Sequence, residues 1–174
     1  MSNRFLFPVA IGLIDGLITA LIIASHAILN DLSISEFAAI RISGGSSLVG
    51  ATSYLVAEYG RRRTDMVRVA RHLNPGNLRP SKNRFVRLGI LLDSVTGGAI
   101  ALGMGFIGSM IPLMSYSVFN MNPYISLGIT FLALGITGIY MGMEAEGSSV
   151  MWVTALILVG ITMLFLGNYL RIFQ

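Results

Sequence analysis

Four carboxylates lie within or at the edge of long apolar stretches of this 174-residue chain: Asp15, Glu58, Asp93 and Glu144. Asp15 stands out because no residue close to it in the sequence can neutralise its charge. A charged side chain near the middle of a membrane-spanning helix costs at least about 2.5–3.5 kcal/mol, so such residues usually face a bundle interior and serve an ion or proton path. A carboxylate can bind a proton or a hard divalent cation, and these are the two chemistries that the acids could perform.

Helical spacing places polar residues on the same faces as these acids. Steps of three or four residues produce three such stripes. They contain Asp15, Thr19 and His26 in the first, Ser47, Tyr54 and Glu58 in the second, and Thr130, Met141 and Glu144 in the third. Hydroxyls and glycines at these positions often serve only to let helices approach closely and hydrogen-bond. That explanation does not account for Asp15 or Asp93.

Several of the other candidates have a structural alternative. His26 is either a packing or interfacial histidine or a proton relay. Glu58 is closely followed by three arginines, so an ion pair is as reasonable as a ligand role. Met141 is either a packing residue or a soft ligand. The candidate metal ligands are therefore Asp15, Glu58, Asp93, Glu144 and Met141, and the candidate ion-pathway residues are Thr19, Ser47 and Tyr54.

The composition indicates which elements must position these residues. Hydrophobic residues make up 54% of the chain and charged residues only 11%, which is too much apolar surface for one small water-soluble core. Five segments can each supply the roughly 20 apolar residues that a membrane-spanning helix needs. We predict an all-α integral membrane protein, a single domain over residues 1–174, with helices at about 6–29, 37–60, 88–112, 123–143 and 149–170.

The basic residues predict the orientation in the membrane. Nine of the twelve lysines and arginines lie between Arg61 and Arg87, and loops rich in these residues stay in the cytoplasm. We therefore expect a cytoplasmic loop at 61–87, a cytoplasmic amino terminus and a carboxyl terminus on the outside. Each basic residue near the surface contributes about 1 kcal/mol to binding of anionic lipid. Head groups are the expected partner, ahead of a nucleic acid, for Arg61, Arg62, Arg63, Arg68 and Arg71.

Small residues indicate close helix packing, and no motif indicates an enzyme. Gly138 and Gly142 form a GxxxG pair, and Ala101, Gly105 and Ser109 form a similar ladder, as expected of a tight bundle or a dimer. The sequence has no P-loop, HExxH, GxSxG or cysteine–histidine zinc spacing. Because no nucleophile–base pair is visible either, we predict neither catalysis nor a cofactor.

Four segments carry a resemblance to a known family. "DGLITAL" at 15–21, "GATSYLVAEYG" at 50–60, "IGSMIPLMSY" at 107–116 and "FLGNYL" at 165–170 resemble, in order, segments of the vacuolar iron transporter family. The resemblance implies a homodimer of five-helix subunits that moves Fe²⁺ or Mn²⁺ out of the cytosol in exchange for protons. It places Asp15 at the family's membrane-centre metal ligand, with helix 1 facing its symmetry mate, and it matches Glu58 to the glutamate of the family's Glu-Tyr pair.

Two features depart from this family and leave alternatives open. Tyr54 replaces a methionine of the family, and the basic segment 61–87 replaces a glutamate-rich, metal-gathering domain. One alternative is a membrane scaffold or partner subunit that transports nothing. Another is a carrier or channel for a different small ion, with Asp15 as its proton site. The short chain favours a prokaryotic plasma membrane over a vacuole.

Overall fold

The computed structural model describes residues 5–30, 32–73, 84–119, 122–144 and 147–169. Within these ranges the chain forms five α-helices and no strand. The helices are α1 (Leu6–Leu29), α2 (Glu36–Leu73), α3 (Arg84–Val118), α4 (Pro123–Glu144) and α5 (Ser149–Tyr169). The predicted all-α fold is confirmed.

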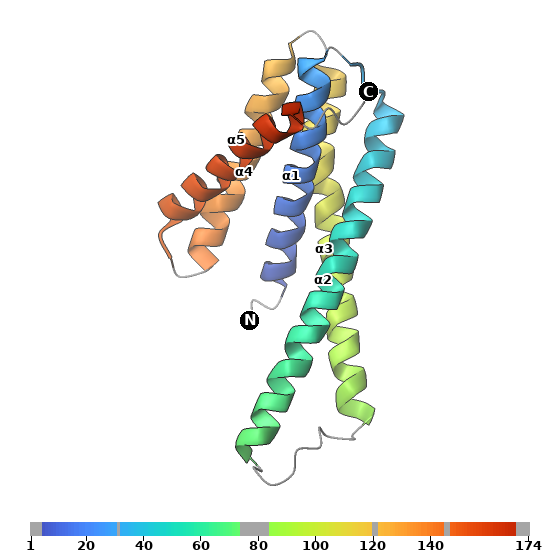
Figure 1. Cartoon of the computed structure of the whole chain (residues 1–174), viewed down its shortest axis with the longest axis vertical. Coiled ribbons are helices and arrows are strands. Elements are labelled where there is room, and N and C mark those ends of the chain that lie inside the picture. Colours follow the sequence, from blue (N-terminus) through green and yellow to red (C-terminus); the bar gives the residue numbers. More distant parts are fainter. Residues whose placement is uncertain (1–4, 31, 74–83, 120–121, 145–146, 170–174) are drawn as a thin grey trace.

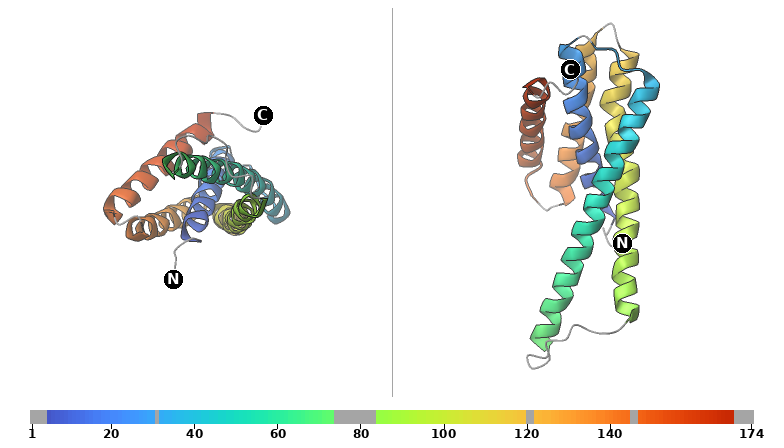
Figure 2. Two further views of the ribbon diagram at one scale, coloured as in Figure 1. Left: turned by 90° about the horizontal axis from the view of Figure 1, so that it is seen from below. Right: turned by 45° about the vertical axis from the view of Figure 1, so that its right-hand side comes forward.

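Helix α1 lies at the centre of the molecule, between α3 on one side and the α4–α5 pair on the other (Figure 1). Two buried clusters hold it there. Ala20 and Ala24 pack with residues of α2 and α3, whereas Leu17 and Leu21 pack with Leu134 of α4. Helix α2 lies along α3 and also contacts α1, and over the described residues it does not contact α4 or α5. The right view of Figure 2 accordingly shows α5 and the first half of α2 on opposite sides of α1.

The closest helix contacts are made at glycines, where the backbones of two helices meet. A Cβ at Gly12 or Gly16 of α1 would collide with the carbonyl oxygen of Ala101 or Gly105 on α3. A Cβ at Gly138 or Gly142 of α4 would collide with the α5 backbone. The close packing predicted for both small-residue motifs is confirmed, because only glycine permits this separation.

The second and third helices are longer than the sequence predicted. Residues 61–73 continue α2 and residues 84–87 begin α3, so both ends of the expected loop 61–87 are helical. No glycine or proline interrupts 61–73, and Arg61 pairs with Asp65 one turn later at 3.8 Å. At its other end α3 continues through Pro112 to Val118. The hydroxyls of Ser115 and Ser126 both donate to the Pro112 carbonyl, at 3.0 Å each.

Four of the five helices are long and apolar enough to cross a membrane: Leu6–Ile28, Leu88–Val118, Tyr124–Met143 and Ser149–Gly167. These four indicate a membrane-embedded protein. Helix α2 does not belong to this group, because its first half is rich in serine and glycine and its second half is basic. That α2 also crosses the membrane, and which end faces the cytoplasm, stay predictions.

Candidate functional site

A cavity of about 490 Å³ lies between α1, α2 and α3. Its polar lining comes from two helices and comprises Asp15, Thr19, Ser46, Ser47, Ser53 and Tyr54. The sequence predicted four of these six as site residues, and the structure brings the four together. Ser46 and Ser53 were missed, although they share the helical spacing of Gly50 and Ala57, which also line the cavity.

Two glycines in the cavity walls make room for its polar side chains, Gly50 for the Asp15 carboxylate and Gly105 for Ser47. A Cβ at Gly50 of α2 would occupy the position of the Asp15 Oδ2 atom. A Cβ at Gly105 of α3 would lie 3.4 Å from Cβ of Ser47. The Ser47 hydroxyl donates to the Gly44 carbonyl at 3.0 Å, which leaves its own oxygen able to accept or coordinate. The cavity therefore has a largely apolar wall into which a few side-chain oxygen atoms are set, and Asp15 is its one carboxylate.

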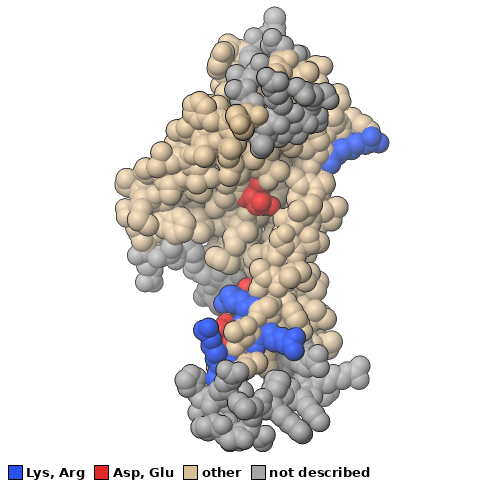
Figure 3. Space-filling model, viewed as in Figure 1, with Lys and Arg blue, Asp and Glu red and all other residues tan. Residues whose placement is uncertain are grey.

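Asp15 is exposed in the single chain. Within the ranges that the structure describes, its carboxylate makes no hydrogen bond or ion pair with another side chain. Figure 3 shows a small acidic patch set in the otherwise uncharged middle of the molecule, well apart from the charges at the lower end. At the level of the apolar helices, an uncovered carboxylate would face hydrocarbon, which is costly.

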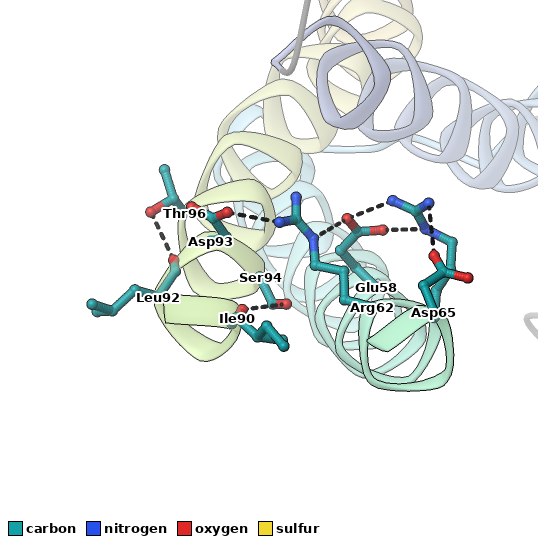
Figure 4. A network of polar contacts seen from close by, with 9 residues as sticks. Glu58, Arg62, Asp65, Ile90, Leu92, Asp93, Ser94 and Thr96 are labelled. Carbon is teal, nitrogen blue, oxygen red and sulfur yellow. Dashed lines mark hydrogen bonds and ion pairs between the residues drawn. The ribbon is translucent and has the colours of Figure 1, made fainter. Parts of the chain in front are cut away.

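The other two described acids of the predicted ligand set belong to a separate ion-pair network (Figure 4). Glu58 is only 6% exposed and accepts from Arg61 Nε and Nη2 at 2.9 and 2.8 Å. Arg62 Nε donates to Glu58 at 2.6 Å, and its Nη1 donates to Asp93 of α3 at 2.7 Å. The structure therefore places Glu58 and Asp93 together, joined by Arg62, and neither lines the cavity of Asp15.

The two positive charges of this network, on Arg61 and Arg62, are permanent. The hydrogen bond to Glu58 raises the pKa of the Arg61 and Arg62 guanidinium groups above its usual value. Both side chains therefore remain cationic at any physiological pH. Of the five arginines expected to contact lipid, these two are engaged with acids, whereas Arg63 and Arg68 are exposed on α2. The side chain of Arg71 lies outside the described part of the structure.

The remaining candidates lie elsewhere. Met141 is half-buried on α4 and does not line the cavity, and the side chain of Glu144 is outside the described part. His26 is 1% exposed near the other end of α1, with Nδ1 3.3 Å from both the Gly167 carbonyl of α5 and the Asn30 side-chain amide. This position agrees with a packing role. Among the described residues, no group of three or more histidines, cysteines or acids is placed to hold a metal ion.

No protein-family model matches this chain, and no curated protein or solved structure matches it either. The class of protein is therefore inferred from the fold and the cavity alone. The chain is an all-α, membrane-embedded protein with one carboxylate in a cavity between three helices.

Proposed function

We propose that the chain is a membrane transporter that exports a divalent cation, Fe²⁺ or Mn²⁺, from the cytosol in exchange for protons. The observation that supports this is the Asp15 carboxylate, exposed beside several hydroxyl side chains in a cavity at the level of the apolar helices. Nothing in the described packing requires a charge there, so the carboxylate costs free energy without stabilising the fold. Binding a cargo is a physical reason to keep it.

The chemistry of the cavity suits this exchange. Carboxylate and hydroxyl oxygens are ligands for hard divalent cations, and Thr19, Ser47 and Tyr54 supply hydroxyls beside Asp15. A carboxylate that holds a proton loses its charge and with it most of its attraction for a metal ion. Metal and proton therefore compete for Asp15, which is the basis of antiport. The resemblance to the vacuolar iron transporters supports the same assignment.

A second copy of the chain would complete the site. One chain brings one carboxylate to the cavity, whereas a two-fold dimer across α1 and α2 would bring two Asp15 side chains to one path. The exposed residues of α2 support such a cover, because they combine the small and polar Gly45, Thr52 and Ser53 with large apolar side chains, among them Leu48, Val49 and Val56. The exposed side of α5 is largely apolar and suits lipid. Covered by its partner, α2 can be the fifth span, with the amino terminus in the cytoplasm.

The basic segment would then lie at the cytoplasmic membrane surface. Exposed Arg63 and Arg68 are available there for anionic lipid head groups. A prokaryotic plasma membrane is the location that we propose.

Uptake into proteoliposomes tests the function. We expect Mn²⁺ or Fe²⁺ to accumulate in vesicles that contain the purified chain and carry a proton gradient, and we expect protons to move in the opposite direction. A scaffold would transport neither ion. A proton flux that needs no metal would support the second candidate, a carrier for another small ion. That candidate draws support from the absence of a three-ligand metal group among the described residues.

A further inference from the structure

One guanidinium group ties α2 to α3 below the cavity. Arg62 bonds Glu58 on its own helix at 2.6 Å and Asp93 on α3 at 2.7 Å (Figure 4). The two acids of this bridge differ in their exposure to solvent. The Glu58 side chain is 6% exposed and is also held by Arg61, whereas the Asp93 side chain is 42% exposed. Solvent screens an exposed ion pair, so the Arg62–Asp93 contact is screened more strongly than the Arg62–Glu58 contact.

The bridge lies one helical turn away from a contact that forms part of the cavity wall. Tyr54 lies one helical turn before Glu58 on α2, and Gly97 lies one turn after Asp93 on α3. The Tyr54 ring packs on Gly97, where a Cβ would be 2.8 Å from its Cε1 atom and 3.1 Å from its hydroxyl. Tyr54 also lines the cavity. The Tyr54–Gly97 contact and the Arg62 bridge are therefore successive contacts between the same two helices.

We propose that the Arg62 bridge and Tyr54 form a gate between the Asp15 cavity and the end of the molecule that carries the basic segment. With the bridge closed, Tyr54 packs against α3 and a fixed positive charge lies on the route of an approaching cation. When Arg62 releases Asp93, it stays on Glu58, α2 separates from α3 at Tyr54, and the cavity opens toward that end. Arg62 is thus a positioning residue that also selects on charge. The inference rests on the proposed function in taking Asp15 as the cation site.

Thiol labelling tests the gate, since the chain has no cysteine of its own. The reporter is Ser47→Cys, a cavity-lining position that is 3% exposed, in inverted membrane vesicles that expose the cytoplasmic face. The probes are a cationic trimethylammonium-ethyl and an anionic sulfonatoethyl methanethiosulfonate, neither of which crosses the membrane. Asp93→Asn removes the charge that Arg62 meets on α3, Arg62→Gln removes the bridge and its charge, and Arg63→Gln removes an equal charge from an exposed neighbour.

We expect Asp93→Asn and Arg62→Gln to speed labelling about tenfold, which corresponds to a small shift in the opening equilibrium. Arg62→Gln should also raise the ratio of cationic to anionic labelling. Arg63→Gln should change either rate less than twofold. The inference is overturned if Asp93→Asn and Arg62→Gln label no faster than the parent, which includes no labelling at all, or if Arg63→Gln has the same effect. A bridge that only braces the helices would lower thermal stability without changing these rates.

Labelling does not depend on transport, so the two proposals can fail separately. Unchanged labelling with active metal transport would remove the gate and keep the transporter. Faster labelling with no metal transport in the parent would keep the gate and remove the metal cargo.

Discussion

Gly50 of α2 lies directly against the carboxylate of Asp15 on α1, so that a Cβ at position 50 would occupy the place of Oδ2. Most residues could not stand there without moving the acid. The glycine at position 50 of α2 therefore allows the Asp15 carboxylate of α1 to keep its position in the cavity.

Gly50→Ala should therefore impair the site while the fold persists. The added methyl group must displace the carboxylate, and we expect the metal concentration for half-maximal transport to rise by about tenfold or more. Gly128→Ala on α4 is the matched control, because a Cβ there meets nothing within 4 Å. Equal transport by the two variants would show that the carboxylate position does not matter.

Asp15→Asn should abolish metal transport and leave expression and dimerisation intact. The amide keeps the shape of the side chain and loses the charge that binds metal. Because a neutral group avoids much of the cost of a carboxylate at this depth, the melting temperature in detergent should be unchanged or higher. Normal transport by this variant, or its unfolding, would make Asp15 a structural residue.

Gly16→Ala should destabilise the bundle. A Cβ at Gly16 collides with the Gly105 carbonyl and would lie 2.8 Å from the Ser109 amide nitrogen, so α1 must move away from α3. Overpacking of this kind costs about 1–3 kcal/mol. Gly103→Ala on α3 meets open space and should gain roughly 0.5–1 kcal/mol from helix propensity. Thermal unfolding of both variants in detergent measures the difference, and equal melting temperatures would refute the close contact.

Cysteines at Ser35 and Ser81 should react with an impermeant thiol reagent from opposite sides of the membrane. Ser35 precedes α2 and Ser81 follows it, so the pair tests whether α2 crosses. Only Ser81→Cys should react from the cytoplasmic side, because the surrounding segment is basic. Reaction of both from one side would leave four spans instead of five.

Cysteines on the exposed face of α2 should cross-link between two copies in native membranes. Val49 and Val56 are suitable positions, since they are 67% and 69% exposed. Leu158 and Phe165 on α5, 58% and 67% exposed, are the controls that we expect to face lipid. Cross-links confined to α5 would move the interface away from the Asp15 cavity.

The sequence alone predicted the helices because the signals that form them are local. An apolar run of about 20 residues and its flanking polar residues place α1, α4 and α5 within about one residue of their observed bounds. Asp15 was likewise identifiable without a structure, since a lone acid in such a run is costly wherever the helix packs. The continuation of α2 beyond residue 60 was missed although its signal is also local, in a segment free of glycine and proline.

Only the tertiary structure decided which polar residues meet. The sequence presented Glu58, Asp93 and Asp15 alike as candidate metal ligands. In the structure, Arg62 joins the first two, whereas Asp15 lines the cavity. Helical periodicity defines a face, but the rotation of one helix against another determines what that face meets. Here that rotation follows from glycine contacts between α1 and α3, residues far apart in the chain, whose complementarity appears only when the helices are packed together.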